Sequence, residues 1–269
     1  MIAGITVEIC AGSLSDCIRA ASVQGTDRIE LNCALELGGL TPSYDTFLSA
    51  RKATDKKIIC MVRPRGAGFV YSETEKDSMY RDAENFLKNG ADGIVFGCLD
   101  PDRTIDIPFT QKMVQLISSY KKEAVFHKAF DETPDPFDAC EKLIECGISR
   151  ILTSGQKDNV EDGIPLLRQL QSRFGSRIEI LPGGGVNEKN AASVLKKTRC
   201  RSIHMSAKSS VEDSPGSYFA VDPAKIRKIL SALENAANRR DLTRDDTAMI
   251  RNDTFEESRY TWPEDDRDH

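Results

Sequence analysis

Two short apolar segments near the amino terminus each carry a glutamate two residues before another polar side chain. The first segment contains Glu8 and Cys10, and the second contains Glu30 and Asn32. Residues two apart share one face of a β-strand, so both members of each pair point the same way. A buried carboxylate is costly unless it is paired. We therefore expect the glutamates either to act as acid–base groups or to form buried ion pairs with Arg63.

Basic side chains follow two other apolar segments. Arg63 and Arg65 flank Pro64 in a rigid turn, where two guanidinium groups suit a carboxylate or phosphate ligand. His127 lies four residues before Asp131, and histidine is the side chain that titrates near neutral pH. With Asp131 to orient it, His127 is a candidate general base or metal ligand. The alternative is a histidine that is simply hydrogen-bonded in the core.

Glycines and hydroxyl groups follow the last three apolar segments. Glycine lets the backbone approach an anion closely, and loops of this kind bind phosphate in many barrels. The alternative is that the three consecutive glycines only form a tight turn. Together with the two arginines, the candidate anion-binding residues in these loops are Thr153, Gly183, Gly184, Gly185, His204 and Ser206.

The candidate residues follow short apolar segments that are rich in β-branched side chains and alternate with amphipathic segments. We expect strands at Ile5–Cys10, Arg28–Leu31, Lys57–Arg63, Gly93–Gly97, Ala124–His127, Arg150–Thr153, Arg177–Leu181 and Ser202–Ser206. We expect helices at Ser13–Gln24, Tyr44–Ala53, Glu73–Asn89, Asp106–Tyr120, Pro136–Cys146, Val160–Phe174, Glu188–Lys197 and Pro223–Asn235. Strands that are hydrophobic almost throughout are typical of a parallel sheet covered by helices.

Eight strand–helix units are the number that closes into a (β/α)₈ barrel. The predicted fold class is therefore α/β, a single TIM barrel of parallel strands over residues 1–237. An open, doubly wound sheet is the alternative, but no GxGxxG motif follows the first strand. In a barrel, polar residues at the carboxyl ends of the strands gather on one face and are functional candidates. Residues 238–269 are dense in charge without a hydrophobic period, which predicts an acidic, flexible C-terminal extension.

The composition excludes several classes of protein. A chain of 269 residues with 39% hydrophobic and 29% charged residues fits a globular protein with one large core. The formal charge of −5 argues against binding nucleic acid through a basic surface. No apolar run is long enough to cross a membrane, and no basic region precedes an apolar stretch at the amino terminus. We therefore expect a cytoplasmic protein with neither a nucleic acid nor a membrane as partner.

The cysteines do not indicate a disulfide framework. The chain has eight of them, scattered singly through apolar segments with no CxxC pair, and its three histidines have no zinc-binding spacing. Most are expected to be small buried side chains. A homo-oligomer, in the simplest case a homodimer, is the expectation from the frequency of such assemblies.

A series of motifs in order between residues 6 and 208 resembles the CutC family, which is named for copper homeostasis. The motifs are VEICAGS, DRIELN, ELGGLTPS, VRPRGAGFVYS, DGIVFG, FHKAFDETPDP, RILTSGQ, LPGGGV and IHMSAK. The resemblance implies a (β/α)₈ barrel, a cytoplasmic location and the binding of Cu(I).

The resemblance also points to metal ligands. Members of the family carry a cysteine at the end of each of the first two strands, and Cu(I) favours thiolates. Cys10 matches the first position, whereas Asn32 stands at the second and Cys33 follows one place later. A shift by one residue changes the face of a strand. Lys128 also stands where the family usually has an arginine, so a bidentate contact is lost.

Two functions follow from these residues. The first is a copper homeostasis protein that binds Cu(I) through Cys10 and Cys33. The second is a barrel enzyme that acts on a small anionic, phosphorylated metabolite. In that case the acid–base groups would be Glu8, Glu30, His127 and Asp131. A scaffold without a working site is a third alternative, and the fold alone does not decide among them.

Overall fold

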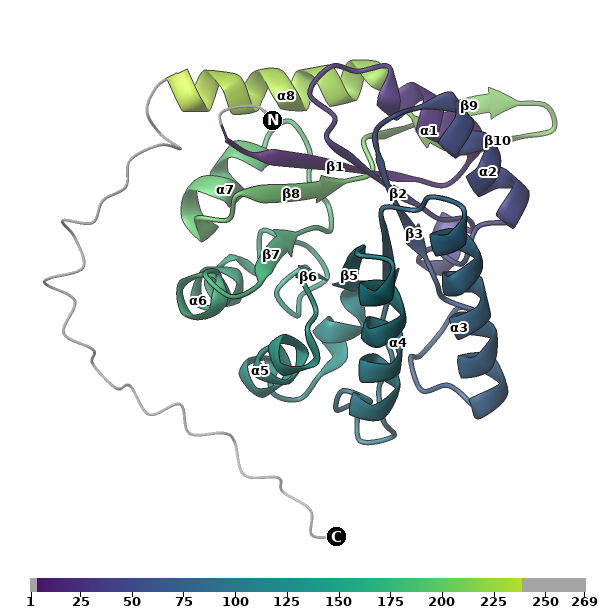
Figure 1. Ribbon diagram of the computed structural model, residues 1–269. Coiled ribbons are helices and arrows are strands. Elements are labelled where there is room, and N and C mark those ends of the chain that lie inside the picture. Colours follow the sequence, from purple (N-terminus) through teal and green to yellow (C-terminus); the bar gives the residue numbers. More distant parts are fainter. Residues whose placement is uncertain (1–3, 239–269) are drawn as a thin grey trace, which may run out of the picture.

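The computed structural model describes residues 4–238 and contains the expected barrel (Figure 1). Its parallel sheet has eight strands in the order β7-β6-β5-β4-β3-β2-β1-β8, and β7 lies beside β8, which brings the two edges together. The strands are β1 Thr6–Ala11, β2 Arg28–Leu31, β3 Lys57–Met61, β4 Gly93–Phe96, β5 Glu123–Phe126, β6 Arg150–Thr153, β7 Glu179–Pro182 and β8 Ser202–Met205. The (β/α)₈ fold predicted from the alternating segments is therefore confirmed.

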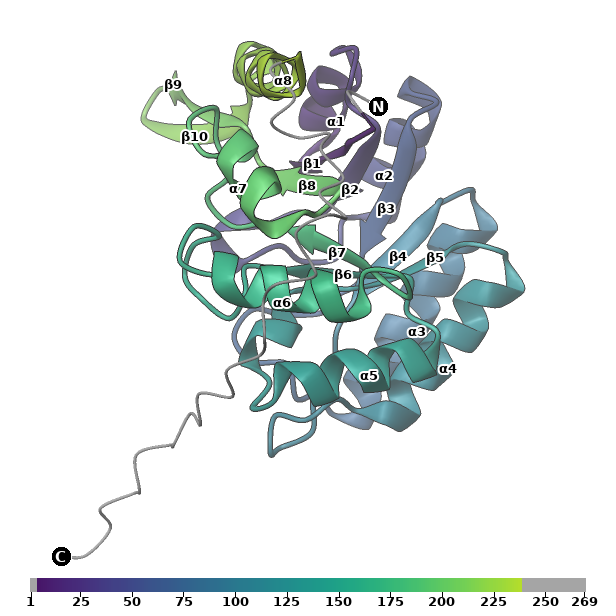
Figure 2. The same cartoon turned by 90° about the vertical axis from the view of Figure 1, so that its left-hand side faces the viewer.

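Helices cover the outside of the barrel (Figures 1 and 2). They are α1 Leu14–Ala21, α2 Tyr44–Ala53, α3 Glu73–Lys88, α4 Ile107–Ser119, α5 Pro136–Cys146, α6 Ile164–Phe174, α7 Ala191–Thr198 and α8 Pro223–Asn238. Two short 3₁₀ helices, η1 Leu35–Leu37 and η2 Lys128–Glu132, lie in loops after β2 and β5. Side chains define the helix ends: Ser72 and Glu75 form a capping box before α3, and Gly147 ends α5 in the left-handed conformation.

Strand alternation sorts the residues as the sequence predicts. The alternate apolar residues of β1 and β2 are fully buried between sheet and helices, in the main core cluster. These residues are Val7, Ile9, Ile29 and Leu31. Glu8 and Glu30 consequently point into the barrel. Inside the barrel, a second small cluster consists of Ile59, Met61, Val95 and Val125.

The amino end of the barrel interior is filled by ion pairs, which we call the charged layer. Arg28 Nη2 lies 2.8 Å from Glu179 Oε1, and Arg150 Nε lies 3.0 Å from Glu179 Oε2. Arg150 also pairs with Glu123, whose Oε1 lies 2.6 Å from Lys57 Nζ. Both arginines are more than nine-tenths buried. Because each of these residues begins a strand or lies at its first inward position, the layer marks the end of the barrel that serves stability.

A β-hairpin after β8 was not predicted. It consists of β9 Lys208–Asp213 and β10 Gly216–Val221, paired antiparallel, and it packs beside α1. The backbone N–H of Val221 donates to Asp16 Oδ1 at 2.7 Å, which ties the hairpin to the start of α1. Most of its side chains are exposed or half-buried. Its first strand is polar, and the apolar run of its second strand, Tyr218–Val221, is buried only at Ala220 and Val221, unlike the buried strands of the barrel.

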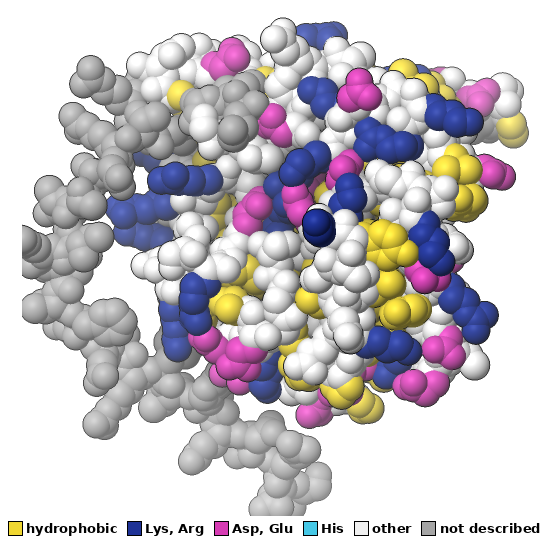
Figure 3. Space-filling view, viewed as in Figure 1, with side chains coloured by type: hydrophobic (Ala, Val, Ile, Leu, Met, Phe, Trp, Pro, Cys, Tyr) yellow, Lys and Arg dark blue, Asp and Glu magenta, His cyan; other side chains and the backbone are white. Residues whose placement is uncertain are grey.

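The surface is mixed in charge. Figure 3 shows basic and acidic side chains next to one another on the described part of the face that it displays. Within residues 4–238 no helix is both long enough and apolar enough to cross a bilayer. The acidic extension expected at 238–269 lies outside the described residues except for Asn238, which ends α8.

The charged layer predicts a large difference between two arginine substitutions. Arg150→Met would remove the most deeply buried cation of the layer, leaving Glu123 with only Lys57 and Glu179 with only Arg28, and we expect it to lower the free energy of unfolding by about 3–5 kcal/mol. Arg177→Met removes an exposed, solvent-screened pair with Glu141 and should leave the free energy of unfolding almost unchanged. Urea denaturation of the two variants checks the prediction, and equal losses would contradict it.

Candidate functional site

The carboxyl ends of β1, β2 and β8 bring three potential ligand groups together. Cys10, Glu30 and His204 each offer an atom, and these atoms all lie within 4.8 Å of one another. We call these three residues the thiol cluster. The registers of the strands explain the cluster, because Cys10 pairs with Glu30 across β1 and β2, while Glu8 pairs with His204 across β1 and β8. All three side chains are buried.

Asn32 and Glu8 hold the thiol cluster in place. Asn32 Nδ2 donates to Cys10 Sγ at 3.2 Å and to Glu30 Oε2 at 3.1 Å, and the Cys10 thiol donates to the same oxygen at 3.5 Å. On the other side, His204 Nδ1 lies 2.8 Å from Glu8 Oε1, and its Nε2 lies 4.0 Å from Glu30 Oε2. The imidazole is thus oriented by Glu8, with Nε2 turned toward the cluster.

Buried charge sets the protonation of this group. Burial alone would raise the pKa of Glu8, but the hydrogen bond from His204 and the charges of Arg28 and Arg150 lower it to about 2. Burial alone would lower the pKa of His204, but Glu30, Cys10 and Glu8 raise it well above its ordinary value. Glu8 is therefore a carboxylate at neutral pH, and His204 tends to carry a proton beside it.

The other two members of the thiol cluster hold their protons more tightly than usual. Burial, supported by the charge on Glu30, raises the pKa of the Cys10 thiol. Burial also raises the pKa of Glu30, against the influence of His204. Three titratable groups from three strands therefore meet in one buried place, where protons can pass between them or be displaced by a metal ion.

Cys33 does not join Cys10. It forms an isolated bridge with Leu40 just after β2, and its thiol donates to the carbonyl oxygen of Thr41 at 3.1 Å. The two-thiolate pair expected from Cys10 and Cys33 is therefore not formed, for the reason that a shift by one residue changes the face. Asn32 occupies the inward position instead.

The expected ion pairs of the two glutamates with Arg63 are also not formed. Glu8 Oε2 accepts from Arg28 Nε at 2.9 Å instead, and Arg150 lies nearby at 3.8 Å. Arg63 lies one inward position beyond Met61 of the apolar cluster, whereas Glu8 is level with the start of β3, so Arg63 is too far up the barrel to reach Glu8. Its guanidinium group donates to the backbone carbonyls of Leu37, Gly39 and Ala67.

Arg65 is similarly occupied by its own loop. Its Nε donates to Glu75 Oε1 at 2.6 Å, and its other nitrogens donate to the carbonyls of Gly66, Gly68 and Val70. The Arg63–Pro64–Arg65 turn therefore holds the long loop after β3 in shape. Anion binding by either arginine stays a prediction.

His127 directly follows β5, inside the barrel, but Asp131 does not orient it. Its Nδ1 accepts from the backbone N–H of Ala129 at 3.1 Å, and its ring packs on Phe69 with centroids 5.0 Å apart. Burial, together with the charge of Arg63, lowers the pKa of His127 to about 3. The imidazole is therefore neutral at physiological pH, and its hydrogen is on Nε2.

Asp131 belongs to a neighbouring loop instead. Its carboxylate accepts hydrogen bonds from the Thr153 hydroxyl, from the backbone N–H and hydroxyl of Ser154, and from the N–H of Gln156. It thereby joins the loops after β5 and β6. The expected partnership of Asp131 with His127 is wrong because η2 turns the carboxylate away from the ring toward β6.

The glycines after β7 do meet other polar loops. Gly184 and Gly185 have positive φ values of 102° and 77°, and a Cβ on Gly184 would lie 3.7 Å from Lys128 Nζ. A Cβ on Gly183 would lie 3.3 Å from His204. Ser206 follows β8 directly and is half-buried. Phosphate binding by this loop, by Thr153 or by Ser206 stays a prediction.

His204 was predicted as an anion-binding residue, and the structure places it in the thiol cluster instead. Two facts together could have found it: side chains alternate between the two faces of a strand, and the sheet closes into a barrel. In a closed barrel the first and eighth strands are neighbours, so an inward residue of β8 faces Glu8 and Cys10. Arg28 and Arg150 were missed because they stand at the starts of strands, where sequence gives no sign of burial.

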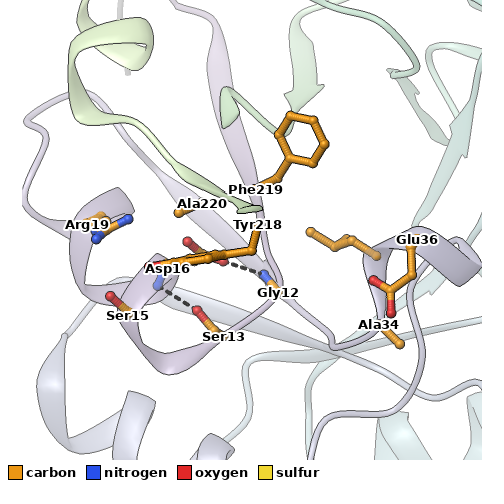
Figure 4. Close-up of a pocket in the computed structure, with 11 residues that line it drawn as sticks. Gly12, Ser13, Ser15, Asp16, Arg19, Ala34, Glu36, Tyr218, Phe219 and Ala220 are labelled. Atoms are coloured by element: carbon orange, nitrogen blue, oxygen red, sulfur yellow. Dashed lines mark hydrogen bonds between the residues drawn. The ribbon is translucent and has the colours of Figure 1, made fainter. Parts of the chain in front are cut away.

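A separate hollow lies outside the barrel, between α1, η1 and the hairpin (Figure 4). Its volume is about 240 Å³, and it is lined by Gly12, Ser13, Ser15, Asp16, Arg19, Ala34, Leu35, Glu36, Tyr218, Phe219 and Ala220. Asp16 accepts from the backbone N–H of Gly12 at 3.2 Å, and Ser13 caps α1. None of the thiol cluster lines this hollow, so it is distinct from the site in the barrel.

Comparison with known proteins identifies the relatives of this chain. The model of the CutC family matches residues 5–209. The chain belongs to the CutC family. A CutC family protein from Treponema denticola is 44% identical over 220 residues, which cover 80% of this chain and 88% of that protein. One from Bacteroides thetaiotaomicron is 43% identical over 206 residues, which cover 76% of this chain and 82% of that protein.

Solved structures agree with the fold. The putative copper homeostasis protein CutC from Streptococcus agalactiae superposes with a TM-score of 0.71 at 30% identity, covering 75% of this chain and 98% of that one. Phosphoribosyl anthranilate isomerase from Thermococcus kodakaraensis superposes with a TM-score of 0.55 at 15% identity, covering 86% and 99%. The second likeness shows that this CutC protein shares its barrel with an enzyme, and nothing beyond the fold.

The neutral, buried His127 predicts a dependence of stability on pH. Its pKa is 6.5 in an ordinary environment and about 3 in the folded chain, so between these values the unfolded chain binds one more proton. The contribution of neutral His127 to the free energy of unfolding is therefore complete above pH 6.5 and is lost as the pH falls toward 3. In His127→Gln, the slope of unfolding free energy against pH should decrease by roughly 1.4 kcal/mol per pH unit in this window. Urea denaturation between pH 4 and 6 checks this, and an unchanged slope would contradict a neutral His127.

Proposed function

We propose that this CutC protein binds Cu(I) through Cys10 and His204 at the carboxyl end of its barrel. The observation that carries the proposal is the thiol cluster, in which a sulfur, an imidazole and a carboxylate lie within 4.8 Å of one another. It replaces the pair of thiolates that the sequence suggested.

The chemistry of these groups fits a soft cation. Thiolate sulfur selects Cu(I), and imidazole is also a good ligand for copper. Glu8 holds His204 Nδ1, so Nε2 is the nitrogen left to bind, which is the usual arrangement of a metal-binding histidine with an acidic partner. Glu30 would supply a weaker oxygen ligand or accept the proton that Cys10 releases.

Two further observations support a role in copper handling in the cytoplasm. The structural relative from Streptococcus agalactiae is described as a putative copper homeostasis protein. All eight cysteines of this chain are free thiols. Unpaired cysteines in this number are typical of a reducing compartment, where Cu(I) is the stable form of the ion. We therefore place the protein in the cytoplasm, with the copper ion as its cargo.

A Cu(I) competition titration tests the proposal with a matched pair of cysteine variants. Cys10→Ser and His204→Gln should each weaken Cu(I) binding by more than the roughly 10- to 100-fold that loss of an outer partner causes. Cys33→Ser should bind as the original chain does, because Cys33 points to Thr41 rather than to the cluster. Binding that survives in Cys10→Ser, or that is lost equally in Cys33→Ser, would overturn the proposal.

A substitution that adds a ligand gives a second test. Asn32 contacts Cys10 Sγ from the inward position after β2, so Asn32→Cys would place a second sulfur beside the first. We expect tighter Cu(I) binding in this variant, measured in the same titration. The control is Cys33→Ser combined with Asn32→Cys, which should show the same gain.

An acid–base enzyme acting on a small anionic, phosphorylated metabolite is the second candidate. The observation that favours it is the raised pKa of Glu30 beside Cys10 and His204, since groups that hold and pass protons are what such catalysis needs. The titration also separates the two functions. Cu(I) affinity that does not depend on Cys10 or His204 would leave the acid–base function as the better account of the cluster.

A further inference from the structure

Next to the thiol cluster, several buried polar atoms have no hydrogen-bond partner within the described part of the chain. They are Asn32 Oδ1, Arg63 Nε and His127 Nε2, on side chains that are 1%, 6% and 4% exposed. The hydroxyl of Tyr71 is buried beside the Arg63 guanidinium, whose charge lowers the pKa of Tyr71 against the effect of burial. Buried polar groups nearly always have partners, so these atoms indicate a polar ligand.

The unpartnered atoms belong to one region of the barrel mouth. Asn32, Arg63 and His127 each occupy the inward position just beyond the end of their strand, β2, β3 and β5. The ring of Phe69 touches both basic side chains, with its centroid 4.9 Å from Arg63 Cζ and 5.0 Å from the His127 ring. Gly97, directly after β4, makes the room for the His127 ring, since a Cβ there would lie 2.4 Å from His127 Cε1.

The hydrogen bonds that each side chain already makes decide whether its unpartnered atom is a donor or an acceptor. His127 Nδ1 accepts a hydrogen bond, so Nε2 carries the hydrogen and is a donor. Arg63 Nε is also a donor. Asn32 Nδ2 donates to Cys10 and Glu30, which leaves its Oδ1 as an acceptor. A complementary ligand therefore has oxygen that accepts two hydrogen bonds and a hydroxyl that donates one.

The charge of Arg63 decides the charge of the ligand. The buried arginines of the charged layer, Arg28 and Arg150, each have carboxylate partners. Arg63 is as deeply buried, but the acceptors of its guanidinium group among the described residues are neutral carbonyl oxygens. A buried cation without a counter-ion favours an anion, and a guanidinium group matches a carboxylate in shape.

We propose that this region binds a small 2-hydroxycarboxylate. Its carboxylate accepts from Arg63 Nε and His127 Nε2, with its flat face against Phe69, and its hydroxyl donates to Asn32 Oδ1. This site adjoins the thiol cluster but does not use Cys10 or His204. It therefore stands independently of Cu(I) binding.

Glycolate and acetate are the probes, because they differ only by the hydroxyl group. They are titrated into the full chain with a copper chelator present. The readouts are the ¹⁵N–¹H resonance of His127 Nε2 and the thermal midpoint. Glycolate should shift this resonance and raise the midpoint, and acetate should bind more weakly because it cannot donate to Asn32. Binding of acetate and glycolate with equal affinity would overturn the assignment of the hydroxyl.

Two arginines of one loop provide the matched control. Arg63→Lys removes the free Nε and should weaken glycolate binding at least about tenfold, the effect of one charge-assisted hydrogen bond. Arg65→Lys should leave it unchanged, because Arg65 Nε is already bound to Glu75. Equal effects in the two variants would overturn the role of Arg63.

If Arg63→Lys fails to fold, His127→Phe keeps an aromatic ring but removes the Nε2 donor together with the Nδ1 acceptor of the Ala129 N–H, and it should weaken glycolate binding similarly. Inorganic phosphate that binds with this dependence on Arg63, while glycolate does not bind, would overturn the carboxylate class. A crystal soaked in glycolate that shows only water at the three atoms would overturn the site itself. Cys10→Ser should retain glycolate binding, so failure of the copper proposal would be recognised separately.

Discussion

One carboxylate joins the two halves of the barrel interior. Glu8 accepts from Arg28 through Oε2 and contacts His204 through Oε1, so it belongs to the charged layer and to the candidate site at the same time. Its negative charge balances a buried cation on either side, which is why its pKa is held at about 2 in spite of burial. The orientation of His204, and with it the geometry of the thiol cluster, depends on ion pairs deeper in the barrel.

The sequence was sufficient for the fold and for the faces of the strands, but not for their partners. Apolar segments alternating with helices predicted all eight barrel strands, and two of them, Arg28–Leu31 and Arg150–Thr153, with the observed bounds. The alternation of side chains along a strand correctly placed Glu8, Cys10, Glu30 and Asn32 inside the barrel. What a sequence does not contain is the stagger of the strands, which decides how deep each inward residue lies. For that reason Arg63 was paired with glutamates that lie below it, and Arg28 was overlooked.

Local backbone geometry accounts for the other differences. A prediction from spacing assumes that a side chain four residues away remains near, as Asp131 was assumed to be near His127. The turn of η2 instead directs Asp131 to Ser154 and Gln156 on the next loop. Cys33 shows the same limit on a smaller scale, since one residue beyond the inward position is enough to remove its sulfur from the site. The hairpin β9–β10 has one polar strand and one with exposed Tyr218 and Phe219, a pattern that differs from the buried barrel strands by which the fold was predicted.

The charged layer also has a consequence for how ligands would enter and leave the barrel. Arg28, Arg150, Lys57, Glu123 and Glu179 fill the amino end of the barrel with ion pairs, whereas both proposed sites lie toward the carboxyl end. A ligand of either proposed site would then enter and leave at the carboxyl end. An ion held low, at Cys10, would sit behind any small acid held at Asn32 and Arg63. Binding and release would then be ordered, with the ion at Cys10 binding before the acid and leaving after it.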